Sequence, residues 1–328
     1  MIPNCTKRVA CVMIAVGVSM TPAMNAGAQG YPARTVRIID VFPPGGSTDV
    51  VARVVAAKLS PAFGQSFVIE NRPGAAGNLG AEIAAKSAPD GHTLLIGLSI
   101  GMAASATLYP NLSYDALRDF APVARAGTST YLLVTHPSLP VRAVKDLVAL
   151  AKSRPGQLHY ASAGTASGAH LSGELLKSRS GINLVHVPYK GGAPSVTAVM
   201  SGETETGFMS VASSVTQVRA GKLRALAIAS ARRSSALPDV ATIAESGFPG
   251  FDVSPSVGFY APAGTPADIV ARLSAEVQKA VAQADVRERF LNVGVESAPA
   301  SGAELSALLK EEIVKWAKVI KDAGIRAD

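Results

Sequence analysis

The chain has 328 residues, 48% of them hydrophobic, which is enough for one large or two ordinary domains. Its formal net charge of +7 is scattered, and no run of Lys and Arg alternates with aromatic residues, so nucleic acid is excluded as an expected partner. Both cysteines, Cys5 and Cys11, lie within the first 28 residues. The remainder therefore cannot form disulfides or zinc thiolates, or use cysteine catalysis.

Residues 1–28 have the pattern of a secretory signal peptide. Lys7 and Arg8 form a basic start, Val9–Met20 is apolar, and Ala26-Gly27-Ala28 offers a cleavage site before Gln29. The apolar stretch is too short to span a membrane. We therefore expect export to the periplasm; the alternative is an uncleaved anchor.

After this leader, short β-rich runs alternate with helical runs. The predicted strands are Thr35–Val41, Ser66–Glu70, Thr93–Gly97, Tyr131–Thr135, Gln157–Ala161, Leu184–Val187, Thr204–Phe208, Leu223–Ser230 and Val257–Ala261. The predicted helices are Thr48–Leu59, Ala76–Ser87, Val144–Ser153, Gly168–Arg179, Ala193–Met200, Ser213–Arg219, Pro266–Ala284, Asp285–Val293 and Gly302–Ala323. This alternation is typical of βαβ units and a largely parallel sheet.

Two Pro- and Gly-rich connectors, "HPSLPVRAV" (136–144) and "GFPGFDVSPS" (247–256), divide the chain. They predict a discontinuous first lobe of residues 29–131 plus 254–328 and a second lobe of residues 132–253. Two lobes joined by two crossovers would enclose a central cleft. In open α/β sheets, ligands bind outside the carboxyl ends of the strands.

Four loops share one design, in which a strand ends, small residues follow and a helix begins. They are "PPGGST" (43–48), "RPGAAG" (72–77), "SAGT" (162–165) and "KGG" (190–192). Small residues allow a ligand to approach the backbone closely, and helix N-termini attract anions. These loops therefore predict a cleft that binds a small anion such as a carboxylate.

A serine hydrolase is the main alternative, because Gly97, Ser99 and Gly101 form a literal G-x-S-x-G motif. The context is poor: only two predicted strands precede the motif, and the residues after it are weakly patterned rather than firmly helical. No dinucleotide fingerprint, P-loop or metal-ligand spacing is present, so we expect no cofactor and no metal. His170, in the first turn of a helix, is either a packing histidine or a ligand contact.

Eight ordered motifs span essentially the whole chain after the leader. They are "YPARTVRIIDVFPPGGSTDVVAR", "GQSFVIENRPGAAGNLGAE", "APDGHTLLIG", "YASAGTASGAHLSGELL", "VHVPYKGGAPSVTAVMSGE", "AGKLRALAIASARRSSALPDVATIAESGFPGF", "FYAPAGTPADIVARL" and "KWAKVIKDAGI". Together they resemble the tripartite tricarboxylate transporter solute-binding family, also called the Bordetella-uptake (Bug) proteins. The resemblance implies a type II periplasmic binding-protein fold, with two α/β lobes around a central cleft joined by two crossovers.

The same resemblance implies a monomeric, non-enzymatic receptor that takes a small carboxylate to integral-membrane transporter subunits. In the family, the loops matching Phe42–Asp49 and Ser162–Thr165 hold one carboxylate, partly through bridging water. The full set of expected ligand-binding residues is Phe42, Pro44, Gly45, Gly46, Ser47, Thr48, Asp49, Ala75, Ser99, Ser162, Ala163, Gly164, Thr165, His170, Lys190, Met209, Ser210 and Ser256. A receptor that presents its ligand to a signalling protein is a third possibility.

Two departures from the family pattern bear on the ligand. Met209 stands where many relatives have Asp, and Ser256 stands where many have an aromatic residue. Methionine is apolar and adaptable, and loss of an aromatic side chain opens space. We therefore expect a dicarboxylate with an apolar, aromatic middle lying against Met209, such as terephthalate, with its second carboxylate near Ser99, His170, Lys190 or Ser256. The rivals are a flexible aliphatic dicarboxylate and a citrate-like acid.

Overall fold

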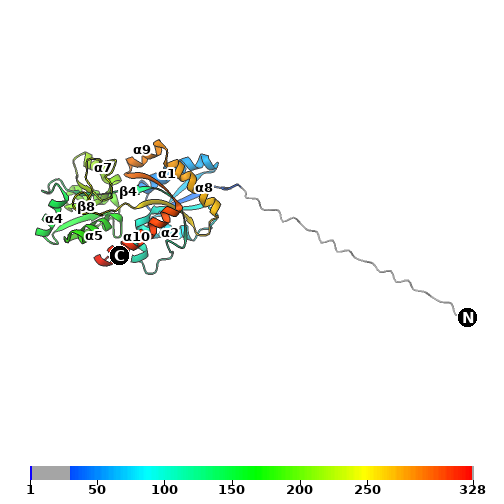
Figure 1. Ribbon diagram of the computed structural model, residues 1–328, viewed down its shortest axis with the longest axis horizontal. Helices are drawn as coiled ribbons and strands as arrows, with labels where there is room; N and C mark the ends of the chain where they lie inside the picture. Colours follow the sequence, from blue (N-terminus) through cyan, green and yellow to red (C-terminus); the bar gives the residue numbers. More distant parts are fainter. Residues whose placement is uncertain (2–29, 327–328) are drawn as a thin grey trace.

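The computed structural model describes Met1 and residues 30–326, so the predicted signal peptide lies almost entirely outside the described residues. The described chain forms two mixed β-sheets, each flanked by helices (Figure 1). None of the helices in this part is long and apolar enough to cross a membrane. The predicted α/β architecture of two lobes is confirmed.

The first sheet has six strands in the order β11-β4-β10-β3-β1-β2. β1 is parallel to β2 and β3, whereas β10 is antiparallel to β3 and β4. Its strands are β1 (Val36–Asp40), β2 (Phe67–Asn71), β3 (Thr93–Leu98), β4 (Phe120–Ser129), β10 (Ser256–Pro262) and β11 (Val295–Ser301). The helices that alternate with these strands along the chain are α1 (Ser47–Phe63), η1 (Ala75–Gly77), α2 (Asn78–Ala85), α3 (Ser99–Leu108), α8 (Ala267–Val281), α9 (Ala284–Asn292) and α10 (Gly302–Ala323).

The second sheet has five strands in the order β7-β6-β8-β5-β9. β6 is parallel to β7 and β8, and β5 is antiparallel to β8 and β9. Its strands are β5 (Tyr131–Thr135), β6 (Leu158–Ser162), β7 (Leu184–Pro188), β8 (Thr206–Ser210) and β9 (Arg224–Ile228). Its helices are α4 (Val144–Ser153), α5 (Gly168–Ser180), α6 (Gly192–Ser201) and α7 (Val211–Arg219).

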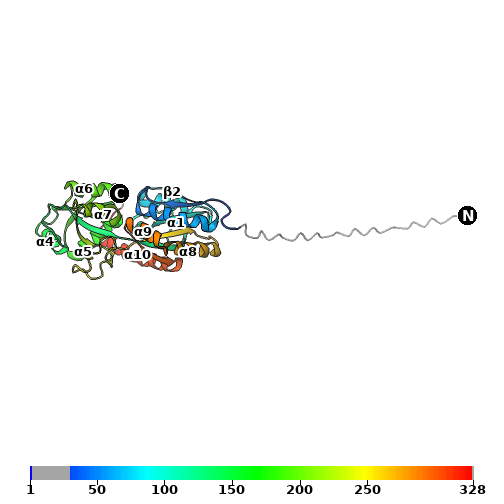
Figure 2. The same ribbon diagram turned by 90° about the horizontal axis from the view of Figure 1, so that it is seen from above.

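The chain passes between the sheets twice, directly from β4 to β5 and again between β9 and β10. The C-terminal helix α10 adds a third connection, because it packs on α3 beside the first sheet and on α5 beside the second. Figures 1 and 2 show α10 lying along the boundary between the two halves. The lobe limits that the sequence predicts stay a prediction, although both crossovers fall near them.

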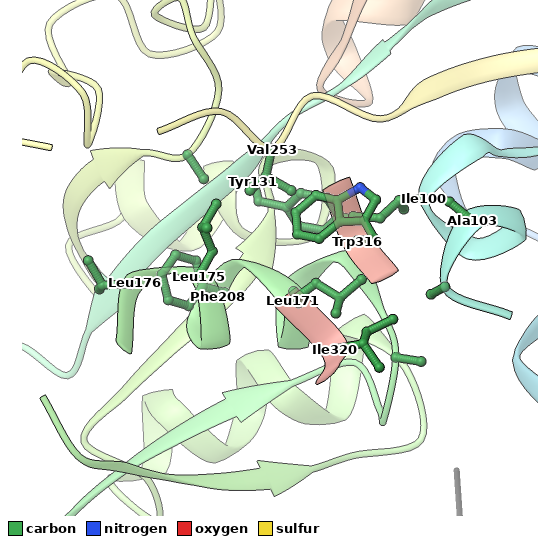
Figure 3. Packing of buried hydrophobic residues seen from close by; sticks show 14 of the residues in the cluster. Ile100, Ala103, Tyr131, Leu171, Leu175, Leu176, Phe208, Val253, Trp316 and Ile320 are labelled. Atoms are coloured by element: carbon green, nitrogen blue, oxygen red, sulfur yellow. The ribbon is translucent and has the colours of Figure 1, made fainter. Parts of the chain in front are cut away.

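Trp316 on α10 lies in a hydrophobic cluster that joins the two halves. Its side chain is only 1% exposed. Figure 3 shows it beside Tyr131 and Val253, which lie on the two crossovers, with Ile100 and Leu171 nearby from α3 and α5. Burial of such an aromatic side chain is among the largest single contributions to a core.

The structure contains three elements that the sequence patterns did not predict. β4 contains Pro122, Ala124 and Gly127, and β11 includes Pro299, so neither has the β-branched alternation of a typical strand. The expectation that no firm helix follows Ser99 was wrong, because α3 is helical from that residue. α3 carries buried residues on most of its surface, and this removes the one-sided apolar pattern of a surface helix.

Candidate functional site

Strand register places the predicted carboxylate loops at facing edges of the two sheets. Leu98 at the end of β3 pairs opposite Val257 in β10, and β1 is parallel to β3. The loop after β1 therefore lies at the edge from which both crossovers depart. In the second sheet, Tyr131 at the start of β5 pairs with Ser210 at the end of β8, and β6 is parallel to β8. The loop after β6 consequently lies at the edge nearest the first sheet.

The predicted site residues differ in how far they are accessible. The residues that are exposed or half-buried are Phe42, Pro44, Gly45, Gly46, Ser47, Ala75, Ala163, Gly164, Thr165, Lys190 and Ser210. Buried are Thr48, Asp49, Ser99, Ser162, His170, Met209 and Ser256. The small residues of the loops are thus accessible, while most of the larger functional side chains are not.

The loop after β1 is held by the carboxylate of Asp49. The N–H of Gly45 donates to this carboxylate at 3.0 Å, Arg53 binds both of its oxygens at 2.9 Å, and Asn71 Nδ2 donates to it at 3.1 Å. Burial disfavours ionisation of Asp49, but the hydrogen bonds from Arg53, Gly45 and Asn71 outweigh it and hold the pKa of Asp49 below its usual value. Asp49 therefore shapes the loop, and its ion pair with Arg53 offsets the negative charge that would otherwise repel an anion.

The N-terminus of α1 has no side-chain cap, because its N-cap residue is Gly46. Its first-turn N–H groups have no partners within the helix, so they can bind a ligand. Ser47 is half-buried there, whereas the Thr48 hydroxyl points inward and donates to Asp40 at 3.0 Å. A helix N-terminus that begins with small residues, lacks a side-chain cap and lies at the carboxyl end of a strand can bind a carboxylate.

Asp40, which the sequence analysis did not single out, lies beneath this loop and is fully buried. The backbone N–H of Phe42 and the hydroxyl of Thr48 donate to its carboxyl group. Burial raises the pKa of Asp40 to about 7, and these donors limit the rise. Asp40 and Asn71 are the last residues of β1 and β2 at this edge of the sheet. Polar residues at the carboxyl ends of predicted strands are therefore the feature of the sequence that could have identified them as site residues.

The loop after β6 is tied to the loop after β7. The N–H of Gly191 donates to the carbonyl of Ala163 at 3.2 Å, and the N–H of Tyr189 donates to the carbonyl of Ser162 at 3.0 Å. The Ser162 hydroxyl accepts from Gly164 N at 3.1 Å and lies 2.6 Å from Nε2 of His186. Two of the predicted loops therefore form one unit in which Ser162 is structural.

His170 belongs to a packed aromatic cluster rather than to an open surface. Its ring stacks on that of His186, with centroids 3.8 Å apart and an interplanar angle of 4°. Its Nδ1 accepts a hydrogen bond from Ala166 N at 3.1 Å, and the ring is buried. Ser167 caps α5 by accepting from His170 N, so this helix start, unlike that of α1, is already occupied. Of the two roles left open for His170, the structure supports packing.

Ser99, Met209 and Ser256 do not offer their side chains to a cleft. The Ser99 hydroxyl accepts from Ser256 N at 2.8 Å, and both residues are at most 2% exposed. The sulfur of Met209 accepts from the hydroxyl of Ser195 beneath α6. The predicted placement of a ligand against Met209 and beside Ser99 or Ser256 is therefore unsupported, because each side chain is packed against protein.

The loop after β2 shows backbone strain. Ala75 and Ala76 have φ angles of 46° and 57°, a left-handed region that non-glycine residues rarely adopt. Strained backbone of this kind persists where the surrounding structure enforces it, often at ligand-binding sites. Among the described residues, no group of three His, Cys, Asp or Glu side chains is arranged to hold a metal ion.

Comparisons with known proteins agree with this architecture. Protein BugT of Bordetella pertussis is 37% identical over 324 residues, which cover 98% of this chain and 99% of BugT. A solved R. palustris protein with adipate superposes with a TM-score of 0.83 at 37% identity, covering 90% of this chain and 99% of that one. MatC of Rhodopseudomonas palustris with bound malate has a TM-score of 0.79 at 35% identity, covering 88% of this chain and all of that one.

A family model described as the tripartite tricarboxylate transporter family receptor matches residues 51–325, which include nearly all the described elements. The resemblance in the sequence motifs is thus confirmed. The chain belongs to this family of solute-binding receptors.

Proposed function

We propose that this protein is a periplasmic receptor that binds a small carboxylate in the cleft between its lobes and passes it to membrane transporter subunits without chemical change. The observation that carries the proposal is the uncapped N-terminus of α1 at Gly46, in a loop whose internal carboxylate, Asp49, is already paired. A helix N-terminus stabilises an anion by about 0.3–1 kcal/mol when exposed and up to about 2 kcal/mol when partly buried. The adipate- and malate-bound relatives support a carboxylate as the ligand.

The narrower proposal is a dicarboxylate with an apolar middle, terephthalate among the aromatic candidates. Its aromatic character rests on the sequence departures at Met209 and Ser256. Because both side chains are buried, the structure adds no support for an aromatic over an aliphatic middle. Direct comparison of ligands is therefore needed to rank them.

The decisive variant is Gly46→Asp. Aspartate is a favourable N-cap residue, and a Cβ at this position would meet only Pro43 O, at an ordinary 3.5 Å, so the variant should fold. Its carboxylate would occupy the first-turn N–H groups and repel a ligand anion. In calorimetric titrations with adipate, malate and terephthalate, we expect Gly46→Asp to weaken binding at least tenfold for every acid that the wild-type protein binds.

Gln283→Asp is the matched control, because Gln283 is the N-cap of α9 and also lacks a side-chain cap bond. It adds the same charge at a comparable helix start outside the proposed site, so binding should remain within about twofold of wild type. Unchanged binding in Gly46→Asp, or failure of all these acids to raise the melting temperature of the wild-type protein, would refute the proposal. A ligand at 100 times its Kd stabilises by about 2.7 kcal/mol, which a melting curve resolves.

A further inference from the structure

A buried carboxyl group lies directly beneath the proposed anion site. Asp40 is the last residue of β1, and its side chain is fully buried. The backbone N–H of Phe42 donates to its Oδ1 at 3.0 Å, and the hydroxyl of Thr48 lies 3.0 Å from Oδ1 and 3.1 Å from Oδ2. Phe42 leads into the loop after β1 and Thr48 lies in the first turn of α1, so both donors belong to the segment to which we assign the ligand. A negative charge on Asp40 therefore lies close to the ligand carboxylate.

Asp40 has no cation of its own among the described residues. Arg53 donates instead to both oxygens of Asp49, each at 2.9 Å. Asn71 Nδ2 lies 3.4 Å from Asp40 Oδ2, but its bonds to Phe42 O and Asp49 Oδ1 are shorter, at 3.0 and 3.1 Å. A buried carboxylate without a paired cation is costly, so it tends to take up a proton.

The surroundings of Asp40 can hold either protonation state without rearrangement. A hydroxyl group is both a donor and an acceptor, so Thr48 Oγ can donate to the carboxylate or accept from Oδ2 when that oxygen carries a proton. The N–H of Phe42 donates to Oδ1 in both states. Asp40 can therefore gain and lose a proton while the loop above it keeps its shape.

The groups around Asp40 favour its titration near neutral pH. Burial raises the pKa of Asp40 to about 7; of the charged groups on α1, Asp49 adds to the rise and Arg53 opposes it. On β2, Glu70 and Arg72 form an ion pair with each other, and β3 carries no charged residue. A ligand carboxylate at the N-terminus of α1 would act on Asp40 as Asp49 does, and would raise its pKa further.

We propose that Asp40 is a proton switch for the ligand site: as the neutral acid it permits a carboxylate to bind at the N-terminus of α1, and as a carboxylate it repels one. Capture of the anion is then accompanied by uptake of a proton from solvent onto an Asp40 oxygen, and release of the ligand returns that proton. Because linkage is reciprocal, a rise in pH that removes the proton weakens ligand binding. The inference rests on the proposed function, since it assumes that the anion binds at the α1 N-terminus.

The first test is the pH dependence of affinity. Calorimetric Kd values for adipate and terephthalate are measured from pH 6.5 to pH 8.5. Free carboxylic acids titrate near a pH of about 4, so the charge of both ligands stays essentially constant over this range. In the free protein Asp40 loses its proton over the same range. We therefore expect the wild-type Kd to rise at least fivefold between the two pH values for each acid that binds.

The second test measures the proton itself and needs no variant. Titrations at pH 7.5 in HEPES and in Tris, which differ in ionisation enthalpy, give the number of protons that the complex takes up. Asp40 is largely ionised in the free protein at this pH and largely protonated in the complex, so we expect uptake of about half a proton per ligand. No uptake, together with a constant Kd, would overturn the proposal.

Asp40→Asn replaces the acid with a neutral amide of the same shape. Its oxygen can accept from Phe42 N and its nitrogen can donate to Thr48 Oγ, so the variant should fold. We expect its Kd to vary by less than about twofold between pH 6.5 and pH 8.5, its proton uptake to disappear, and its binding at pH 8.5 to be tighter than that of wild type. A residue with a merely structural role would instead weaken binding at every pH when replaced.

Glu312→Gln is the matched control. Burial also raises the pKa of Glu312 to about 7, but this residue lies on α10, and the groups that act on it are Ser99, Lys315 and Asp252 rather than the loop after β1. The variant therefore removes a carboxyl group that titrates in the same range at another place. It should keep the wild-type pH dependence of Kd and the wild-type proton uptake.

The possible failures are distinct. If none of the acids binds the wild-type protein, or Gly46→Asp leaves binding unchanged, the proposed function fails and this inference fails with it. If Gly46→Asp weakens binding but the wild-type protein takes up no proton, only the switch is refuted. The switch is likewise refuted if a folded Asp40→Asn variant keeps the wild-type pH dependence. That result would assign the dependence to other groups, such as His170 and His186, which stack in the second lobe.

Discussion

The hydroxyl oxygen of Ser99 lies 2.8 Å from the backbone nitrogen of Ser256 and accepts its hydrogen bond, so the first residue of α3 is fastened to the first residue of β10. The carboxyl group of Glu312 on α10 also lies near the Ser99 hydroxyl, which opposes a rise in the pKa of that carboxyl. The serine of the G-x-S-x-G motif is thus completely buried at the second crossover. It holds the connection between the lobes, and this explains its position better than a role as a nucleophile.

We expect Ser99→Ala to bind ligand within a few fold of wild type and to unfold more easily. The substitution leaves the buried N–H of Ser256 without its acceptor, which costs about 1–3 kcal/mol. Thermal denaturation measures this loss, with Ser153→Ala on the exposed surface of α4 as the control. We expect wild-type protein to show no ester hydrolysis. Hydrolysis that disappears in Ser99→Ala would contradict the structural role and restore the hydrolase alternative.

Two carboxyl groups with raised pKa values, those of the buried Asp40 and the half-buried Glu312, should make stability depend on pH between about 4 and 7. Burial raises the pKa of Asp40 to about 7, and burial likewise raises that of Glu312 to about 7, although the nearby Ser99 hydroxyl and the positive charge of Lys315 oppose the rise. Both groups bind more protons in the folded than in the unfolded chain across this range. Their stabilising contribution is therefore full below a pH of about 4 and is lost as the pH rises to about 7.

Glu312→Gln should flatten this dependence. Its Oε2 has no hydrogen-bond partner among the described residues, so the neutral amide avoids the cost of burying a charge. Between pH 5 and pH 8 we expect wild type to lose of the order of 1–3 kcal/mol for each of the two carboxyl groups, and the variant to lose that for Asp40 alone. Urea denaturation at several pH values measures the difference. Equal slopes in the two proteins would show that Glu312 is already ionised at pH 5.

The preference for an aromatic ligand is tested by ranking terephthalate, adipate, succinate and citrate by calorimetry. On the sequence-based hypothesis, terephthalate binds at least tenfold more tightly than the aliphatic acids, a difference of about 1.4 kcal/mol. Tight binding of citrate or succinate, with no response to the aromatic acid, would contradict it.

Ser256→Trp, which the sequence suggests as a way to refill an open site, should instead destabilise the protein. Ser256 is 2% exposed and pairs with Thr128 in the first sheet, so a large ring there would overpack the lobe by about 1–3 kcal/mol or more. A lower melting temperature is the expected result. A stable variant whose ligand ranking changes would show that position 256 faces the ligand after all.

The sequence predicted the two-lobed architecture because alternating strands and helices, together with small-residue loops, are local features. It did not predict burial that depends on distant segments. The packing around Ser99 depends on α10, more than 200 residues away, and that of Met209 on the helix before it. The sequence patterns did not predict β4 and β11, because these segments are kept extended by their pairing within the sheet rather than by their own composition. The accessible small residues were predicted, but the polar groups beneath them, such as Asp40 and Asn71, were not.

Closure of the lobes on the ligand should be visible at Trp316. This residue is the one tryptophan of the chain, and it is buried between the crossovers and helices of both halves (Figure 3). A hinge motion at Tyr131 and Val253 would change the environment of its indole, so we expect ligand to alter the tryptophan emission and to reduce the radius of gyration in small-angle scattering. Trp316→Phe should retain closure but lose the emission signal, and Trp316→Ala should lower stability by about 3–5 kcal/mol. Identical scattering curves with and without saturating ligand would mean that the lobes do not close on it.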